Sequence, residues 1–213
     1  MEFFKEARLG LIFLKFVKDP TQTGLIFKMS DLGRSLKRNQ KMIAALEHDL
    51  GKHGSFHRDW KQKWLPELPA MESLAIMPEG SLGRAYYEHL TKNNLKINFF
   101  PAVQAERFVD YISYRLYGSH DLWHILLGYD VSPKGESEIQ AFTLAQVKSP
   151  TSVMLITAGF LNLLRRQPES TPEIFSACVD AYNRGRNAKF LLDFRLEEML
   201  LEPITKIKDL TQI

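Results

Sequence analysis

The chain has 213 residues, of which 45% are hydrophobic and 25% are charged, and this is the composition of a folded globular protein. Its 28 basic and 25 acidic residues leave a formal charge of +3 at pH 7, a surplus too mild for a protein dedicated to nucleic acid. The single cysteine, Cys178, excludes an internal disulfide framework and a four-thiolate metal site, and it is typical of a reducing compartment.

Neither the N-terminal segment nor the longest apolar stretch has the features of a targeting or membrane-spanning segment. Glu2 and Glu6 come too early for a signal peptide, and no small-residue cleavage site follows them. The longest uncharged stretch, residues 149–164, is shorter than the roughly 20 apolar residues that cross a bilayer. We therefore expect no signal peptide and no transmembrane helix, so that any membrane contact is peripheral.

Helical periodicity runs through most of the chain, and sustained strand alternation is absent. In chain order, the expected helices cover residues 3–17, 24–29 after a cap at 21–23, 32–50, 81–90, 103–117, 120–129, 133–147, 150–165, 172–185, 188–201 and 204–210. Residues 51–78 are expected to form loops and short turns, and residues 95–101 an extended segment or short strand. The sequence predicts an all-α fold, with residues 1–213 as a single domain built as a multi-helix bundle or orthogonal helical array.

Several helix starts have recognisable cap residues. Ser81 precedes one expected helix, and Pro133, Pro150 and Pro172 each follow a serine or threonine. A hydroxyl side chain can accept a hydrogen bond from the first turn, and proline suits the first helical position. These pairs fix where four of the helices are expected to begin.

The most informative segment is SHDLWHILLGYDVSPKGE, residues 119–136. His120 and His124 stand four residues apart on an expected helix, so both imidazoles leave the same face and can share a divalent ion. Asp121 lies one step round the helix, where it can reach the ion or hold the second nitrogen of a histidine. Glu136 follows a short loop, in the first turn of the next helix, and an antiparallel helix pair would return it beside the histidines. The spacing predicts an open metal site that suits Lewis-acid or water-activating chemistry.

The alternative for these residues is a pair of half-buried helical histidines with hydrogen-bond partners, and a first-turn glutamate favoured by the helix dipole. The motif is not HExxH, because no glutamate between the histidines can act as a protease base. Among metals, zinc fits the imidazole donors best; magnesium, which suits carboxylates and phosphates, and manganese are further candidates.

The same residues resemble the COQ-four family of ubiquinone (coenzyme Q) biosynthesis proteins, whose hallmark is H-D-x-x-H, eleven residues, then E. His120, Asp121, His124 and Glu136 match it with the spacing intact. Further matching elements are Asp19-Pro20 with Thr23, the stretch PEGSLGRAY at residues 78–86, and the late Gly185-Arg186.

The resemblance implies a metal-binding, mostly helical protein that binds long polyprenyl lipids at the inner or cytoplasmic membrane, facing a reducing compartment. It also implies a role in ubiquinone synthesis, as an organiser of the biosynthetic complex and in removal of the head-group carboxyl with hydroxylation at that ring carbon. The implied partners are a polyprenyl lipid or prenylated quinone precursor, the membrane surface and other quinone-biosynthesis proteins, and no nucleic acid.

Two features could serve such a lipid. Residues 151–164 are apolar nearly all round, with Met154, Leu155 and Phe160 among them, and they could form a central core helix or wall an apolar lipid-binding cavity. Gly159 would let a neighbouring helix or a prenyl chain approach closely.

Basic and aromatic residues near the N-terminus offer a membrane-facing surface. Arg34, Lys37, Arg38 and Lys41 are expected to form one basic stripe, and Phe3, Phe4, Leu11 and Leu14 could be apolar anchors. The alternatives are a solvated basic face and a first helix packed in the core or in a homodimer.

Three arginines, Arg84, Arg115 and Arg186, are candidates to bind a carboxylated or phosphorylated head group. The alternative for each is a surface or interface ion pair. Cys178 is expected to be a buried small apolar residue.

Three functions fit these patterns. In the first, which we favour, the protein is a polyprenyl-lipid-binding metalloprotein that presents or processes the prenylated head group of a quinone precursor, with His120, His124 and Glu136 as metal ligands. The resemblance implies that the processing is a metal-dependent oxidative decarboxylation. Asp121 would be ligand or general base, and Asp121 with His124 would carry the catalysis. The second is an HD-type metal-dependent phosphohydrolase, which needs a further histidine and aspartate. His89 with Asp180 or Asp193 could supply them, but nothing in the spacing selects these residues. The third is a non-catalytic scaffold that presents lipid to partner enzymes.

Overall fold

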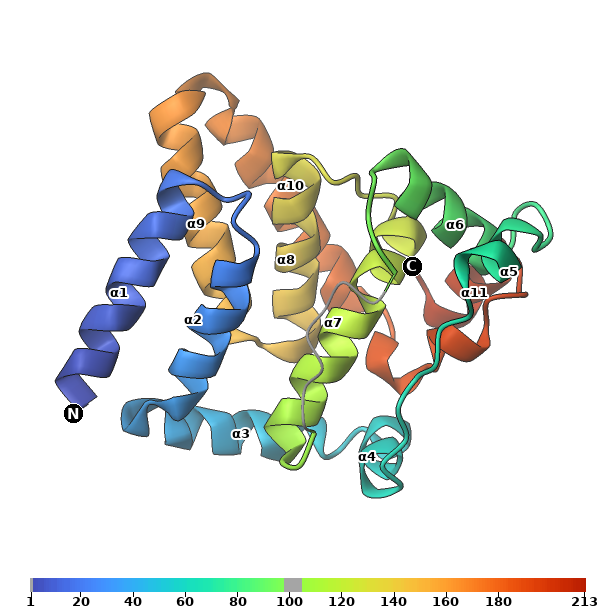
Figure 1. Cartoon of the computed structure of the whole chain (residues 1–213), viewed down its shortest axis with the longest axis horizontal. Coiled ribbons are helices and arrows are strands. Elements are labelled where there is room, and N and C mark those ends of the chain that lie inside the picture. The colour runs from blue at the N-terminus through green and yellow to red at the C-terminus, as the bar shows by residue number, and fades with distance from the viewer. Residues whose placement is uncertain (1, 98–104) are drawn as a thin grey trace. The chain divides into compact units, whose positions relative to one another are not determined.

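The structure is a computed structural model that describes residues 2–97 and 105–213 (Figure 1). Its α-helices are α1 (Glu2–Lys18), α2 (Gly24–Ser35), α3 (Gln40–Leu50), α4 (Gly54–Lys61), α5 (Met71–Ala75), α6 (Leu82–Lys92), α7 (Phe108–Leu127), α8 (Pro133–Val147), α9 (Pro150–Arg166), α10 (Thr171–Asn187) and α11 (Ile204–Thr211). Four 3₁₀ helices join them: η1 (Lys37–Asn39), η2 (Pro168–Ser170), η3 (Leu191–Asp193) and η4 (Leu196–Glu198). The described residues contain no strand, so the predicted all-α class is confirmed.

The chain divides into two compact units. The first contains residues 1–48 and 132–186, and the second contains residues 49–131 and 187–213. The interpretation of residues 1–213 as a single domain stays a prediction.

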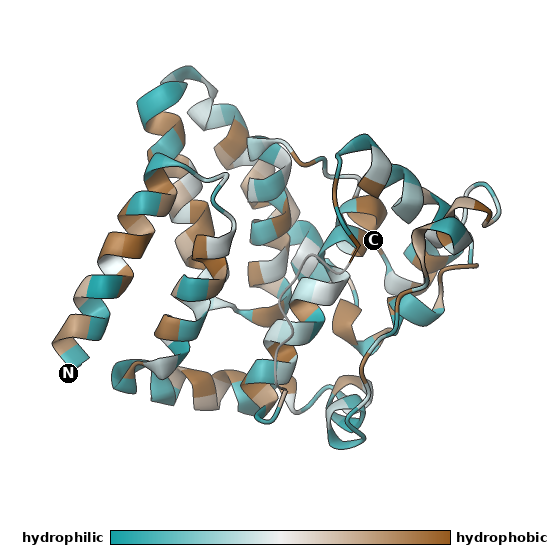
Figure 2. Ribbon diagram, viewed as in Figure 1, coloured by the Kyte–Doolittle hydropathy of each residue, from teal (hydrophilic) through white to brown (hydrophobic). Residues whose placement is uncertain are grey.

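In the first unit, α1 and α2 pack against each other and against α9, which also packs against α8 (Figure 1). Their shared core contains Leu9, Phe16, Met29, Leu36 and Ala158. Leu9 and Phe16 are seven residues apart, so they lie on one face of α1 two turns apart. Hydrophobic residues also lie elsewhere on this helix (Figure 2), and Phe3, Phe4, Leu11 and Leu14 are exposed.

One of two glycines lets helices of this unit approach closely. A Cβ atom at Gly159 would lie 3.5 Å from Ser137 Oγ on α8, which is an ordinary van der Waals distance. A Cβ atom at Gly185 of α10 would lie 2.9 Å from both the Phe142 carbonyl oxygen and Ala145 Cβ. Since such distances leave no room for a methyl group, glycine sets the contact between α8 and α10.

In the second unit, α6, α11 and η4 pack against α7, the longest helix described. The largest fully buried side chains of this unit are Trp123, Arg115, Tyr111, Phe56, Leu74, Leu82, Leu90, Leu122 and Leu126. Because α7 supplies five of these nine, it is the central helix of the unit.

The expected caps are confirmed at three helices: the hydroxyls of Ser81, Ser132 and Ser149 accept hydrogen bonds from first-turn amides. Thr23 is the N-cap residue of α2, as expected, but its side chain makes no cap bond. The cap expected at Thr171 is wrong, because α10 begins at Thr171 itself, directly after η2.

The helix expected over residues 32–50 is broken. Leu36 has an extended backbone and is fully buried in the core of the first unit. The side-chain amides of Asn39 and Gln40 donate to the carbonyls of Gly33 and Arg34, so the last carbonyls of α2 find partners without a further helical turn. The basic residues expected on one stripe, Arg34, Lys37, Arg38 and Lys41, therefore do not share a helix.

The helices expected over residues 103–117 and 120–129 form the single helix α7. Gly118 lies inside it, because a glycine in a helix interior costs only about 1 kcal/mol relative to alanine and does not by itself end the helix. The start of the first expected helix at Val103, and residues 98–101 of the expected extended segment, lie outside the described residues. Residues 51–78, expected as loops and short turns, contain α4 and α5.

The helix expected over residues 188–201 is also wrong: this segment contains only η3 and η4 among the described elements. Leu191, Leu192, Leu196 and Leu200 are all buried, and their spacing imitates one face of a helix. Asp193 instead accepts the backbone N–H of Phe56 at 2.9 Å, and Arg195 pairs with Asp59 at 2.8 Å. These long-range partners hold the segment in an irregular path.

Candidate metal centre

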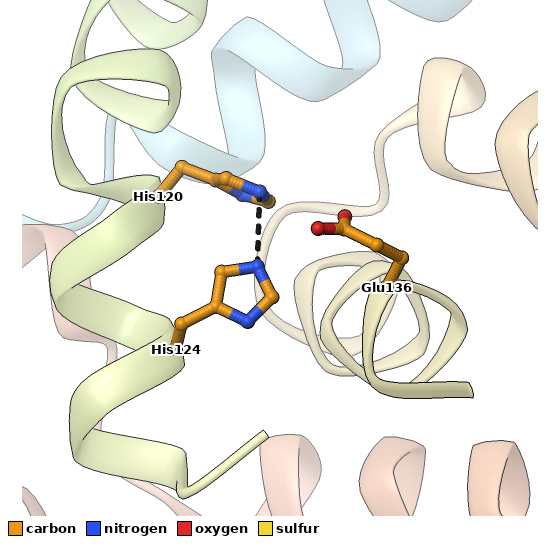
Figure 3. A group of neighbouring side chains, drawn as sticks. All are labelled: His120, His124 and Glu136. Atoms are coloured by element: carbon orange, nitrogen blue, oxygen red, sulfur yellow. Dashed lines mark hydrogen bonds between the residues drawn. The ribbon is translucent and has the colours of Figure 1, made fainter. Parts of the chain in front are cut away.

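Two imidazoles and one carboxylate converge at the end of α7. His120 and His124 leave the same face of α7, and the carboxylate of Glu136, from the first turn of α8, points toward them (Figure 3). One ligand atom of each residue lies within 4.8 Å of the others. The structure thus brings together the three residues that the sequence singled out as metal ligands.

The ring of His124 is oriented by the chain that follows it. Gly128 has a φ of +75°, and the N–H groups of Gly128 and Tyr129 both donate to the carbonyl of His124, at 2.9 and 3.2 Å. This turn brings the Tyr129 carbonyl to 3.0 Å from His124 Nδ1. A carbonyl only accepts, so Nδ1 carries the proton and the lone pair of His124 is on Nε2. That Nε2 lies 3.2 Å from His120 Nε2.

Glu136 is placed by the start of α8. Ser132 caps this helix, and the N–H of Glu136 donates to the Ser132 carbonyl at 2.8 Å. The negative charge of Glu136 therefore sits in the first turn, where the helix dipole favours it. The local chemistry of the serine–proline start fixes where this carboxylate leaves the helix.

The donor set fits a divalent transition-metal ion. Two imidazole nitrogens and one carboxylate oxygen leave coordination positions for water or substrate. A hydrogen bond on the far nitrogen of a ligating histidine, as His124 has to Tyr129, is the usual way in which proteins hold such a ligand.

Asp121 is not one of the three converging residues. It lies near Tyr86 of α6, whose pKa is raised by burial and, in second place, by the charge of Asp121. Its roles as metal ligand or general base stay predictions.

Arg115 lies one and a half turns before His120 on α7, inside a buried ionic cluster. Its guanidinium is 3.7 Å from Asp59 and 3.7 Å from Glu197, and it donates to the Phe194 carbonyl at 3.2 Å. The indole of Trp64 packs against it at 4.6 Å. Sequence reasoning missed these partners, because they come from segments more than 50 residues away on either side and no local pattern marks them.

Glu197 is the unusual member of this cluster. Among the described residues, neither carboxylate oxygen of Glu197 has a hydrogen-bond partner, and neither does Arg115 Nε. Burial raises the pKa of Glu197, and the nearby Arg115 lowers it by less.

The residues expected to hold a lipid or its head group lie in three places. Arg84 of α6 pairs with Glu88 at 2.8 Å and also donates to the Ala75 carbonyl. Met154 and Leu155 of α9 pack against the core of the first unit. Phe160 contacts Phe175 of α10, with ring centroids 6.0 Å apart. A lipid-binding cavity and head-group contacts stay predictions.

Cys178 is buried as expected, and burial raises the pKa of its thiol to about 11.

No described helix is both long enough and apolar enough to cross a membrane.

Fold and site together define a helical protein with a candidate two-histidine, one-glutamate metal centre. Residues 64–213 match the protein family described as "Coenzyme Q (ubiquinone) biosynthesis protein Coq4". The chain belongs to this family, which takes part in ubiquinone biosynthesis. The first and third of the functions considered above both place the protein in quinone synthesis, as the family assignment does.

Relatives agree with this assignment. The chain is 30% identical over 189 residues to the mitochondrial ubiquinone biosynthesis protein COQ4 homolog of Rattus norvegicus, covering 79% of this chain and 69% of that protein. It is 28% identical over 149 residues to mitochondrial COQ4 of Saccharomyces cerevisiae, covering 67% of this chain and 42% of the yeast protein. A crystal structure of a putative ubiquinone biosynthesis protein from Nostoc punctiforme has the same fold, with a TM-score of 0.80, 23% identity and 97% of each chain covered.

Proposed function

We propose that this protein binds a divalent metal ion through His120, His124 and Glu136 and uses it as a Lewis acid in the oxidative decarboxylation of a prenylated aromatic precursor of ubiquinone. The reaction releases the ring carboxyl as CO2 and leaves a hydroxyl in its place, and because zinc does not change its oxidation state, we propose molecular oxygen as the external two-electron oxidant. The observation that supports this proposal is the convergence of the three donor atoms within 4.8 Å, in a chain whose family takes part in ubiquinone biosynthesis. We propose zinc as the ion on the basis of the two imidazole donors, with manganese and magnesium as alternatives.

In this proposal the protein orients its metal-ligand atoms before the ion binds. When bound, the ion would supply a Lewis acid for the carboxylate or phenolate oxygen of the aromatic acid and stabilise negative charge on the ring. The Tyr129 carbonyl keeps the Nδ1 proton of His124 in place, so that Nε2 stays available as a ligand. Asp121, beside His120 on α7, is the candidate general base. Among the three candidate head-group arginines, we favour Arg84 over Arg115, because the side chain of Arg84 is partly exposed while that of Arg115 is enclosed by its partners.

The test combines metal analysis with quinone synthesis in a deletion strain. Untagged wild-type protein should carry close to one equivalent of metal, and His124→Ala and Glu136→Gln should lose it. Both variants should fail to restore quinone synthesis at normal protein level, whereas the exposed-residue control His48→Ala should restore it fully. Wild-type protein that stays metal-free after reconstitution with zinc, manganese and magnesium would refute the metal centre. Full quinone synthesis by His124→Ala would point to the scaffold function instead.

We also propose that α1 contacts an anionic membrane surface. Its exposed side bears the apolar residues Phe3, Phe4, Leu11 and Leu14 together with the exposed basic residues Arg8, Lys15 and Lys18. Apolar residues interspersed with basic ones suit insertion among anionic headgroups.

Flotation with phosphatidylglycerol vesicles tests this contact. Wild type should float, and the double variant Leu11→Ser/Leu14→Ser should float much less. Ile76→Ser is the matched control, because Ile76 is an exposed apolar residue far from α1 in the sequence. Equal flotation of wild type and the double variant would remove α1 as the contact.

A further inference from the structure

A third imidazole lies next to the candidate metal centre, on a helix that the motif does not include. His89 of α6 stacks on His124, with ring centroids 5.7 Å apart and planes inclined by 24°. Neither the spacing of the metal motif nor the family elements in the sequence singled out His89. Its position follows from the packing of α6 against α7.

The packing of α6 on α7 explains why His89 meets His124. Tyr86 and His89 are three residues apart on α6, and Asp121 and His124 are three residues apart on α7, so each pair lies on one helix face. Asp121 is close enough to Tyr86 to contribute to the raised pKa of that phenol. The two faces are thus in register, Tyr86 with Asp121 and His89 with His124.

His124 needs more than one contact to keep its ring in place. The hydrogen bond from Nδ1 to the Tyr129 carbonyl fixes one atom of the ring but leaves the plane free to tilt about it. His120 meets the ring edge-on, at 4.7 Å and 89°. A stacked ring on the face of His124 opposes the tilt that would turn Nε2 away from the ion.

We infer that His89 is a positioning residue for the metal centre: it holds the plane of the His124 imidazole by stacking on it, and acts through His124 rather than as a ligand. In line with this role, His89 is not among the three residues whose ligand atoms lie within 4.8 Å of one another. The inference rests on the proposed metal function.

The role predicts which substitutions matter. Phenylalanine keeps an aromatic face and removes both ring nitrogens, so His89→Phe should bind metal about as well as wild type. His89→Ala removes the face, and loss of a group that supports a ligand typically weakens metal binding about 10–100-fold. A ligand role would instead make the two variants equally weak.

The experiment measures zinc affinity by competition with a chromophoric chelator, and records the visible absorption of the cobalt(II)-loaded protein. We expect His89→Ala to lose at least about tenfold in affinity and to change the cobalt bands, with His89→Phe restoring both. Lys92→Ala, an exposed change on the same helix, is the control. Melting of the metal-free variants shows whether His89→Ala folds. If it does not, His89→Leu, which fills the space without an aromatic face, replaces it and should show the same loss of affinity.

The outcomes separate this inference from the function on which it rests. Wild-type protein that binds no metal removes both. Wild-type protein that binds metal, with His89→Ala unchanged in affinity and spectrum, overturns only the role of His89. A loss in His89→Phe as large as in His89→Ala overturns the stacking role too, because it would mean that a ring nitrogen is needed.

Discussion

Replacing Arg115 by methionine should be among the most damaging single changes outside the metal centre. The Arg115 side chain is 1% exposed, and it lies between the carboxylates of Asp59 and Glu197, each side chain at most 3% exposed. Methionine fills most of the volume but removes the charge. Asp59 keeps Arg195 at 2.8 Å, whereas no other cation is paired with Glu197 in the described part of the chain.

The magnitude follows from the burial of this cluster. Removing one partner of a buried ion pair costs about 3–5 kcal/mol, because the remaining charge stays in a medium that solvates it poorly. For a chain of this length, each kcal/mol lowers the melting temperature by about 2–4 °C, so we expect a fall of about 6–20 °C. The lost hydrogen bond to the Phe194 carbonyl and the lost contact with Trp64 act in the same direction.

Urea unfolding at pH 7 of wild type, Arg115→Met, Glu197→Gln and the double variant tests this reasoning. Glu197→Gln removes the charge that Arg115→Met leaves behind, so the double variant should regain most of the lost stability. Arg107→Met is the control on the same helix; its pair with Asp110 is largely exposed on the arginine side and should be worth about 0–1 kcal/mol. A loss below about 1 kcal/mol for Arg115→Met, or no recovery in the double variant, would refute the argument.

Two further predictions concern stability. Burial raises the pKa of Glu197 above its ordinary 4.5, so the folded state binds this proton more tightly than the unfolded state does. The stability that the bound proton contributes is fully present below about pH 4.5 and is lost as the pH rises through the raised pKa of the folded state. Urea unfolding as a function of pH should therefore show Glu197→Gln gaining on wild type above about pH 4.5, and parallel curves would contradict this. Gly185→Ala should lose about 1–3 kcal/mol by thermal unfolding, because its methyl group would overlap Phe142 and Ala145; unchanged stability would mean that α8 and α10 can move apart freely.

The candidate metal centre could be predicted from the sequence because its determinants are local. His124 follows His120 by four residues, which places both rings on one helix face, and a serine–proline start fixes the first turn that holds Glu136. The tautomer of His124 could not be predicted, because it depends on the left-handed turn at Gly128 and on the carbonyl that this turn presents.

Errors in the predicted elements came from segments whose pattern is compatible with more than one structure. Leucines at positions 191, 192, 196 and 200 have helical spacing, yet the segment is irregular because Asp193 and Arg195 bind residues of α4. The break at Leu36 has the same origin, since burial of this side chain in the core of its unit outweighs continuation of the helix.

The sequence by itself therefore determined the helical class, most helix starts and the residues of the metal motif, because each depends on neighbours within one or two helical turns. Only the tertiary structure decided the partners of Arg115, the register of His89 on His124 and the closeness of Gly185 to α8. These contacts join segments far apart in the chain, and no periodicity within a segment specifies which distant surface it will meet.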